Sequence, residues 1–433
     1  MLTFSAPLCY DSIRRIVDLI DNLNGVLFKL WSEMGRCDMK KYDFETVVHR
    51  HRTGSMKWRE LEDYDCPEDV IPFSVADMEL KNMPEVIEGL KGFLDSSVLG
   101  YANPSEQYKA AVCGWMERRH GWTIRPEWIV DTPGVIHAFF TAVHAFTRPG
   151  DNILLLTPVY YPIYMAAQRN SRGLSESPLL RDESGIYHVD WADLEAKARD
   201  PKTTLFILCS PHNPLGRVWT PEELERMAQI CLDNGVLICS DEIHNDLIMP
   251  GYRHTVLATL REDIAQRSII CTSPSKTFNL AGLQTSNIII PNESLREQFQ
   301  REMGRHDGNP KCNILGLEAC RLAYTCGDQW LEQVLALIYA NYRLVADFLA
   351  AEFPAVRVTP LEGTYLLWID LGPLGIEPKE LDRILREEAH LFFDDGAIFG
   401  SAGVGFERWN LACPSSYIEK ALERLRTLKR FCP

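Results

Sequence analysis

Residues 268–287 read Ser-Ile-Ile-Cys-Thr-Ser-Pro-Ser-Lys-Thr-Phe-Asn-Leu-Ala-Gly-Leu-Gln-Thr-Ser-Asn. The apolar run from Ile269 to Cys271 predicts a buried parallel strand whose last residues reach the carboxyl edge of a sheet, where open α/β folds bind ligands. Lys276 follows in a polar loop directly beyond that strand. Because lysine side chains are ordinarily solvated, the alternative is a surface lysine in a turn. The rest of the chain decides between these two interpretations.

The composition is that of a large globular protein. With 433 residues the chain can form two lobes, because single cores stop growing at about 250–300 residues. Hydrophobic residues make up 46% and charged residues 24%, and no uninterrupted apolar run approaches the roughly 20 residues that a membrane span needs. The net charge of −15 argues against a nucleic-acid surface. We therefore expect a small-molecule substrate and neither a membrane nor a nucleic-acid partner.

The cysteines and the N-terminus bear on location. The chain has 13 cysteines, scattered singly and without a Cys-x-x-Cys pair. This pattern supports neither a disulfide framework nor a zinc knuckle, so no metal is expected. The N-terminus has no basic region followed by a compact apolar one and a cleavage site. We expect a cytoplasmic protein with reduced thiols.

Four segments are predicted along the chain. Residues 1–41 form an N-terminal extension, in which apolar residues at helical spacing over 11–31 predict an amphipathic helix. The alternative is a mis-assigned start, since Met39 opens a natural-looking beginning. Residues 42–85 are an N-terminal arm that belongs to the small domain, residues 86–313 the large domain, and residues 314–433 the small C-terminal domain.

From Asp151 onward the pattern strand, loop, helix repeats. Strands are predicted at 153–156, 204–209, 236–239 and 269–271, which indicates an α/β fold with a mostly parallel, doubly wound sheet. The loops after these strands would bring Tyr160, Asn213, Asp241 and Lys276 to one edge. Further strands near 356–359, 365–370 and 406–411 predict a smaller α+β lobe.

Two other stretches bear on ligand binding. Residues 131–140 predict a turn that opens into an apolar helix, whose first backbone N–H groups are free to bind a phosphate. The glycine cluster at 400–405 does not fit Gly-x-Gly-x-x-Gly between a strand and a helix, so we interpret it as a loop.

A lysine, a carboxylate, an amide and an aromatic ring at one sheet edge could together hold pyridoxal 5′-phosphate (PLP). The lysine forms an imine with the aldehyde, the carboxylate keeps the pyridine nitrogen protonated, the amide bonds the ring hydroxyl, and the aromatic ring stacks on the cofactor. Each residue also has an ordinary structural explanation. Tyr160 could be a core aromatic, Asp241 a helix N-cap, and Arg408 a partner for a surface carboxylate.

Three motifs carry a family resemblance. Pro-x-Asn-Pro-x-Gly at 211–216, Ser-Asp-Glu-Ile-His at 240–244 and Ser-x-Ser-Lys-Thr-Phe-Asn at 273–279 resemble, in order and spacing, those of fold type I PLP-dependent enzymes of the aminotransferase class I/II superfamily. The resemblance runs from about Tyr42 to the C-terminus. Residues 73–78, 209–219 and 408–414 are most similar to the MalY/PatB group of cystathionine β-lyases.

The resemblance implies a role for each matching residue. Lys276 would form the imine and act as general base, Asp241 would pair with the pyridine nitrogen, and Tyr160 would stack on the ring. The remaining contacts would come from Asn213 and His244 at the ring hydroxyl, Ser273 with the Val135 and Ile136 N–H groups at the phosphate, Tyr101 at the phosphate across a homodimer interface, and Arg408, beside Asn213, at the substrate carboxylate.

Two positions depart from the family pattern. Many aminotransferases have a phosphate-binding arginine eight residues after the lysine, where this chain has Gln284. Pro274 between the serines is also unusual. Neither change removes a catalytic group.

The resemblance implies a carbon–sulfur β-lyase that cleaves L-cystathionine or related S-substituted cysteines to homocysteine or another thiol, pyruvate and ammonia, in methionine biosynthesis and cysteine metabolism. An aminotransferase shares the steps up to proton removal and is the first alternative. The second is a PLP-fold regulatory protein that contacts an unknown protein partner and has secondary lyase activity. The sequence separates these poorly.

Overall fold

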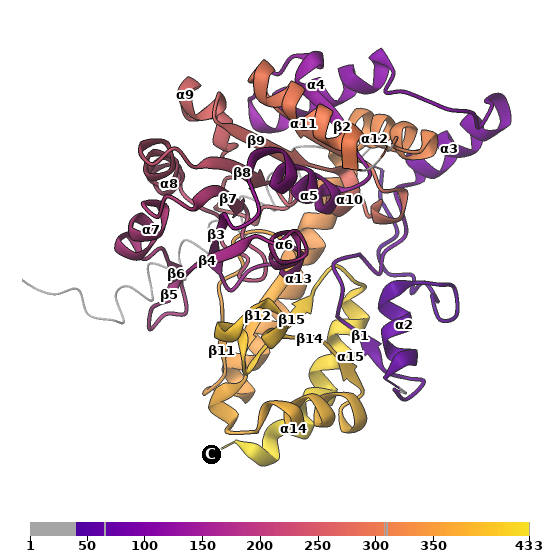
Figure 1. Cartoon of the computed structure of the whole chain (residues 1–433). Helices are drawn as coiled ribbons and strands as arrows, with labels where there is room; N and C mark the ends of the chain where they lie inside the picture. The colour runs from indigo at the N-terminus through magenta and orange to yellow at the C-terminus, as the bar shows by residue number, and fades with distance from the viewer. Residues whose placement is uncertain (1–39, 65, 307, 309–310, 433) are drawn as a thin grey trace, which may run out of the picture. The chain divides into compact units, whose positions relative to one another are not determined.

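The computed structural model describes residues 40–64, 66–306, 308 and 311–432 (Figure 1). The chain divides into a unit that ends at Tyr42 and a second unit, Asp43–Pro433. Only the second is described below. The helix predicted at 11–31 lies outside the described residues.

The larger sheet has the strand order β2-β10-β9-β8-β7-β3-β4. Its strands are β2 (Ile129–Thr132), β3 (Asn152–Thr157), β4 (Gly173–Pro178), β7 (Thr203–Cys209), β8 (Leu237–Asp241), β9 (Ser268–Thr272) and β10 (Ser286–Ile289). Neighbouring strands from β9 to β4 are parallel, while β10 is antiparallel to both β9 and β2. The predicted α/β fold with a mostly parallel sheet is confirmed. Strands β2, β4 and β10 were not predicted. Within their bounds β2 and β4 contain no run of three apolar residues, whereas the apolar run at 288–290, at the end of β10, is as long as the one in β9 and was overlooked.

Helices cover both faces of this sheet. One face packs against α5 (Val135–Phe146), α6 (Tyr161–Gln168) and α11 (Glu293–His306) in one continuous apolar core. Strand residues of the other parity are also buried, on the face that contacts α7 (Trp191–Ala198), α8 (Pro221–Asp233) and α9 (Glu262–Ala265). Strands buried on both faces explain the apolar runs that made β3, β7, β8 and β9 predictable.

The smaller sheet is antiparallel, with the order β11-β12-β15-β14. Its strands are β11 (Arg357–Val358), β12 (Leu366–Asp370), β14 (Asp394–Asp395) and β15 (Phe406–Asn410), close to the bounds predicted for three of them. The helices α13 (Asp328–Glu352), α14 (Pro378–Arg383) and α15 (Ser415–Leu425) belong to the same lobe. This is the predicted α+β architecture.

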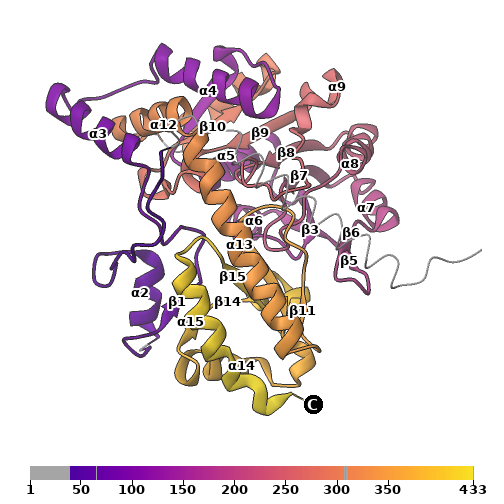
Figure 2. The ribbon, with the colours of Figure 1, turned by 180° about the vertical axis from the view of Figure 1, so that it is seen from behind.

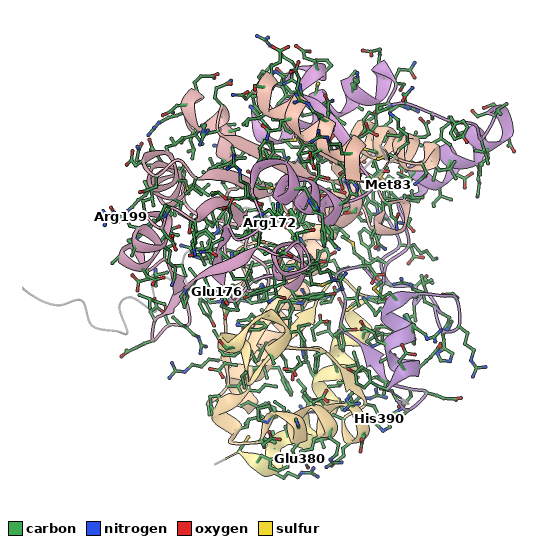
Figure 3. All side chains as sticks on the ribbon, in the orientation of Figure 1. Met83, Arg172, Glu176, Arg199, Glu380 and His390 are labelled. Carbon is green, nitrogen blue, oxygen red and sulfur yellow. The ribbon has the colours of Figure 1, made fainter. Side chains whose placement is uncertain are left out.

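The arm at the start of this unit pairs with the smaller lobe. It contains α2 (Met56–Asp63) and β1 (Ile71–Pro72), and β1 pairs in parallel with β13 (Leu391–Phe392). Beside this pair, Asp69 accepts a hydrogen bond from His390, which Figure 3 labels, and forms an ion pair with Arg424 of α15. Backbone pairing thus brings residues about 320 positions apart into contact.

The predicted domain boundary at residue 314 divides the helices differently from the packing. Helix α12 (Ile314–Cys326) contacts α3 (Pro84–Ser96) and α4 (Glu106–His120). Helix α4 in turn belongs to the larger lobe, because its Tyr108 hydroxyl donates to the Asn287 side chain of β10. The smaller lobe therefore begins with α13 rather than with α12.

Helix α13 is long and apolar enough, by length and composition alone, to cross a membrane. In the fold it contacts α15 and β11, and Figure 2 shows it running along the smaller sheet. Trp330, Val334 and Ile338 are buried along it. The buried Asn341 amide donates to the carbonyl oxygens of Leu411 and Cys413. These contacts hold the chain that follows β15.

Candidate active site

Lys276 lies on α10 (Pro274–Thr277), one turn beyond β9. Its Nζ atom donates to the Ala76 carbonyl oxygen at 2.6 Å, so the arm crosses directly over the lysine. Burial lowers the pKa of Lys276 to about 8, against the attraction of the Asp77 and Asp241 carboxylates. The neutral amine is therefore within reach near neutral pH.

Asp241 is the last residue of β8 and is buried. It stands in register between Cys209 of β7 and Cys271 of β9. Its carboxylate accepts a hydrogen bond of 3.3 Å from the Ile243 N–H group, and no cation of the described residues lies within 4.0 Å of it. Burial raises the pKa of Asp241 to about 7. A cation brought to this carboxylate would ionise it.

Arg408 is buried on β15 and is held by two side chains. Its Nε and Nη2 atoms donate to Asp394 Oδ2 at 3.0 and 2.5 Å, and its Nη1 atom donates to Asn213 Oδ1 at 2.9 Å. The guanidinium also lies over the Phe399 ring, 4.6 Å from its centroid. Since a guanidinium has five N–H donors, these bonds leave two for a further acceptor.

Tyr160 and Asn213 meet through their backbones. The Tyr160 N–H group donates to the Asn213 carbonyl oxygen at 3.1 Å, where the loops after β3 and β7 run together. The Tyr160 ring is partly buried against the core of the larger lobe, and burial raises the pKa of its phenol. The predicted grouping of Tyr160, Asn213, Asp241 and Lys276 at one sheet edge is found in the structure.

His244 lies buried in the loop after β8. Its ring is 5.8 Å from that of Tyr365, centroid to centroid, and its Nδ1 atom has no hydrogen-bond partner within the described part of the chain. Burial, with Lys276 and Arg408 nearby, lowers the pKa of His244, so the imidazole is neutral. A buried ring nitrogen without a partner is available to a ligand atom.

The predicted phosphate site has one part that fits and one that is engaged elsewhere. Helix α5 begins at Val135, after Gly134, whose φ of 102° suits glycine, and no side chain caps its first N–H groups. The N–H groups of Val135 and Ile136 therefore stand at an uncapped helix N-terminus. Ser273, by contrast, donates its hydroxyl proton to the Thr285 carbonyl oxygen at 2.7 Å and caps α10.

Tyr101 and Gln284 lie outside this constellation in the single chain. The Tyr101 side chain is fully exposed in the segment between α3 and α4. Gln284 is exposed too, and has a left-handed φ of 46°. Within the described residues, no group of three or more His, Cys, Asp or Glu side chains is placed to hold a metal ion.

The arm over Lys276 is strained and well anchored. The Ala76 carbonyl oxygen also accepts the Tyr365 hydroxyl at 2.9 Å. Val75 and Thr364, next to these two residues, have φ values of 50° and 67°. Left-handed backbone is unusual for β-branched residues and concentrates at functional sites. Both strained residues thus flank the contact that receives the lysine.

The arm itself contains a cluster of paired charges. We call Arg50, Lys57, Asp77 and Glu79 the arm cluster. Lys57 Nζ is 3.0 Å from Asp77 Oδ1 and 3.4 Å from Glu79 Oε1, and Arg50 contacts the same two carboxylates at 2.6 Å each. Asn410, two residues after Arg408, donates to the Asp77 carbonyl oxygen at 2.6 Å. The arm is therefore tied to the strand that carries Arg408.

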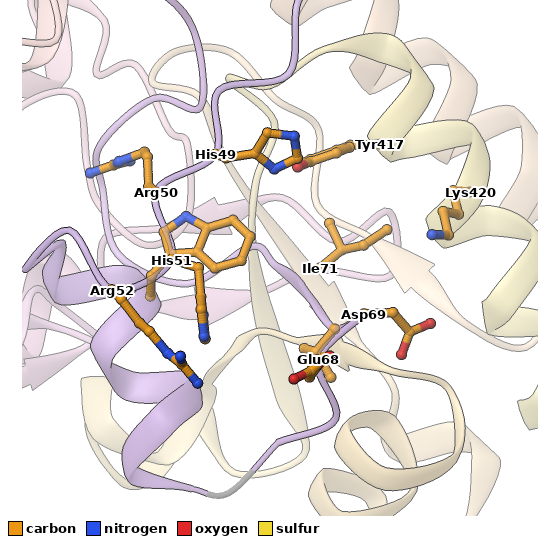
Figure 4. A pocket seen from close by; sticks show the side chains of 11 residues that line it. His49, Arg50, His51, Arg52, Glu68, Asp69, Ile71, Tyr417 and Lys420 are labelled. Atoms are coloured by element: carbon orange, nitrogen blue, oxygen red, sulfur yellow. The ribbon is translucent and has the colours of Figure 1, made fainter.

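A pocket beside the arm cluster, lined in part by Arg50, does not belong to the candidate active site. It has a volume of about 440 Å³ and is lined by residues that include His49, Trp58, Tyr417 and Lys420 (Figure 4). None of the residues singled out from the sequence lines it.

Comparisons with known proteins agree with this geometry. The sequence profile of the aminotransferase class I and II family matches residues 68–425. The chain belongs to this family. It is 39% identical over 384 residues to cystathionine β-lyase PatB of Bacillus subtilis, covering 89% of this chain and 99% of PatB. It is 33% identical over 386 residues to the protein MalY of Escherichia coli, covering 89% and 98%.

Solved structures extend the likeness. Cystalysin from Treponema denticola, whose structure contains PLP, superposes with a TM-score of 0.88 at 44% identity and covers 90% of this chain and 99% of its own. The PLP-bound C–S lyase from Staphylococcus hominis superposes with a TM-score of 0.83 at 31% identity, covering 91% and 98%. The expected fold of class I and II aminotransferases is confirmed.

Several contacts of this family member were missed at the sequence level. Ala76 acts through a backbone carbonyl, which no residue type signals. The Tyr365 hydroxyl donates to a carbonyl oxygen 289 positions earlier, whereas Asp394 accepts from Arg408, 14 positions later. The one available signal was Arg408 itself, because a buried arginine needs a carboxylate partner. Asp394 and Asp395 were the nearest acidic pair before it outside its own strand.

Proposed function

We propose that this protein is a PLP-dependent carbon–sulfur β-lyase that cleaves L-cystathionine or a related S-substituted cysteine to a thiol, pyruvate and ammonia. The lyase relatives support the reaction. The observation within the molecule that carries it is the trio of Asp241, Lys276 and Arg408, which offers a counter-charge, a proton-transfer group and a carboxylate site at one sheet edge.

The residues present fit PLP. Asp241 is a buried carboxylate without a cationic partner among the described residues, as required of a group that pairs with a protonated ring nitrogen. The uncapped start of α5 suits a phosphate, and the unpartnered Nδ1 of His244 suits a ring oxygen. When bound, PLP supplies a sink for the electron pair that remains on the substrate Cα after deprotonation.

The protein's own groups then divide the work. The two N–H donors that Arg408 has left bind the substrate α-carboxylate, and the bond to Asn213 fixes the angle of the guanidinium. Lys276, with its pKa lowered to about 8, holds or releases a proton at Cα near neutral pH. The Ala76 carbonyl oxygen accepts a hydrogen bond from the lysine amine, and the bond between Lys276 and PLP would replace this contact.

The test separates elimination from amino transfer. The purified enzyme is incubated with L-cystathionine and without any keto acid, and thiol, pyruvate and ammonia are measured. A β-lyase gives the three products in equal amounts over many turnovers. An aminotransferase stops after about one turnover without free thiol, because its cofactor then needs a keto acid. Activity that requires an added keto acid would overturn the proposal.

We also propose that the enzyme is a homodimer. The segment between α3 and α4 exposes Val98, Leu99 and Tyr101 together, and contiguous exposed apolar residues mark interaction surfaces. Tyr101 would then reach the phosphate site of the partner subunit. Light scattering of the native protein should give twice the chain mass, and Tyr101→Ala should weaken PLP binding. A monomer with full activity would exclude this assembly.

Cytoplasmic location and a place in methionine and cysteine metabolism are proposals of the same kind. No disulfide joins the cysteines of the described residues, and most of these thiols are buried, which fits a reducing compartment. Cell fractionation would test the first. Growth without methionine on cystathionine, in cells that lack their own β-lyase, would test the second.

A further inference from the structure

Asp246 is a buried carboxylate that no part of the proposed chemistry uses. It lies in the loop after β8 and accepts hydrogen bonds from three side chains. Trp115 Nε1 lies 3.1 and 3.2 Å from its two oxygens, His120 Nε2 lies 2.8 Å from Oδ1, and the Thr277 hydroxyl lies 2.8 Å from Oδ2. Although burial favours the neutral acid, the bond from His120 lowers the pKa of Asp246, so it is ionised.

One of these three donors is the neighbour of the candidate lysine. Thr277 directly follows Lys276 and is the last residue of α10, which is only one turn long. A single helical turn has little stability of its own, so its position depends on its anchors. Ser273 caps the first end of α10, and the bond from Thr277 to Asp246 fixes the second.

The other two donors form a rigid platform. Trp115 and His120 lie on α4, and the Trp115 ring stacks on that of Tyr324 with centroids 5.0 Å apart and planes at 6°. The Phe278 ring, one residue beyond Thr277, meets Trp115 edge-on at 5.4 Å. Asp246 is thereby held from α4 and holds α10 in turn.

Asp246 lies five residues after Asp241, the last residue of β8. The Asp246 carboxylate therefore ties the turn that carries Lys276 to the segment that follows the candidate ring-nitrogen partner. We propose that Asp246 is a positioning residue, which acts through Thr277 to set the place of the Lys276 amine relative to Asp241. The inference deepens the proposed function and rests on one part of it, the attachment of PLP to Lys276.

The test removes the hydroxyl and keeps the shape. Thr277→Val loses the bond to Asp246, and Thr277→Ser keeps it. Thr141→Val is the matched control, because the buried Thr141 hydroxyl donates to the carbonyl oxygen of His137 in its own helix and has no other hydrogen bond among the described residues. Each cofactor-free variant is mixed with PLP, and covalent attachment to Lys276 is followed by borohydride trapping and peptide mass analysis.

Thr277→Val should slow attachment about 10-fold or more, since a small displacement of a reacting group costs that much. Thr277→Ser should stay close to the native rate, and Thr141→Val should match it. Attachment of the Thr277→Val variant at the native rate would overturn the proposal. So would an equal loss in Thr141→Val, because the effect would then be general destabilisation.

The pH dependence of attachment gives a second readout. Attachment needs the neutral amine, whose pKa burial lowers to about 8 in the native chain. If Thr277→Val lets Lys276 move toward solvent, the rate should rise at higher pH than in the native protein. An unchanged pH profile would contradict displacement. A wild-type protein that attaches PLP but does not cleave cystathionine would overturn the proposed function and leave this test intact.

Discussion

The arm cluster and the candidate active site both contain buried charged groups, and they are built differently. In the arm cluster, each carboxylate contacts both cations within 3.4 Å. At the candidate active site, neither Asp241 nor Lys276 has an opposite charge within 4.0 Å among the described residues. Burial disfavours the charged forms in both groups. Only in the arm cluster do opposite charges within the chain offset that cost.

The pKa values record this difference. Burial favours the neutral form of Asp77, yet the attraction of Lys57 and Arg50 lowers its pKa below the ordinary value. With no such partner, burial raises the pKa of Asp241 to about 7 and lowers that of Lys276 to about 8. A buried charge that is paired with an opposite charge of the same chain is structural. A buried charge without such a partner marks a place where an external group binds.

The largest effect is expected when Lys276, the general base of the candidate active site, is removed. Lys276→Ala should lower kcat by about 10²–10⁴-fold, the usual contribution of general acid–base catalysis, and should abolish covalent PLP attachment. Turnover is measured with L-cystathionine and attachment by borohydride trapping. A variant that kept both would show that the lysine assignment is wrong.

Removing one cation from the arm cluster should instead lower the free energy of unfolding. Lys57→Met leaves the buried Glu79 and the partly buried Asp77 with one cation, and loss of one partner from a buried ion pair costs about 3–5 kcal/mol. Chemical denaturation measures the change in the free energy of unfolding. Arg59→Met is the control, because the Arg59–Asp63 pair on the same helix is exposed and should contribute little. Equal changes in the free energy of unfolding in the two variants would show that the arm cluster stabilises the protein no more than a surface ion pair does.

Asp241 and Lys276 could be predicted from the sequence, whereas the arm cluster could not. Asp241 and Lys276 follow apolar strands of a parallel sheet, and that topology alone brings strand ends together. The arm cluster joins α2 to residues about 20 positions later through an irregular segment, where no periodicity reports on contacts. Arg408 was recognised from a motif, but its partner Asp394 depends on the register of β14 and β15. Local patterns thus predict strand ends, while long-range register has to be observed.

Asp241→Asn should stabilise the protein without PLP. The folded-state pKa of about 7 lies above the ordinary 3.8, so native protein loses stability as pH rises from about 4 to about 7. Removing the ionisable group should therefore raise the free energy of unfolding by about 2–4 kcal/mol at pH 8, with a smaller gain at pH 5. Denaturation of cofactor-free protein at both pH values measures this. PLP binding should weaken in the same variant, and a gain equal at both pH values would contradict the linkage.

The smallest effect concerns Arg408, which lies between the two kinds of group. Asp394 and Asn213 occupy three of its five N–H donors. Arg408 is therefore paired with a carboxylate, as in the arm cluster, but keeps two donors for a ligand. Arg408→Lys keeps a charge near Asp394 but cannot present two parallel donors to a carboxylate. Loss of one such charge-assisted bond costs about 1.5–3 kcal/mol, so KM for L-cystathionine should rise about 10–100-fold.

Covalent PLP attachment should stay near native, because Arg408 does not contact Lys276. Steady-state kinetics measures KM. An unchanged KM would move the carboxylate site elsewhere, and a loss of stability as large as that of Lys57→Met would make Arg408 a structural cation.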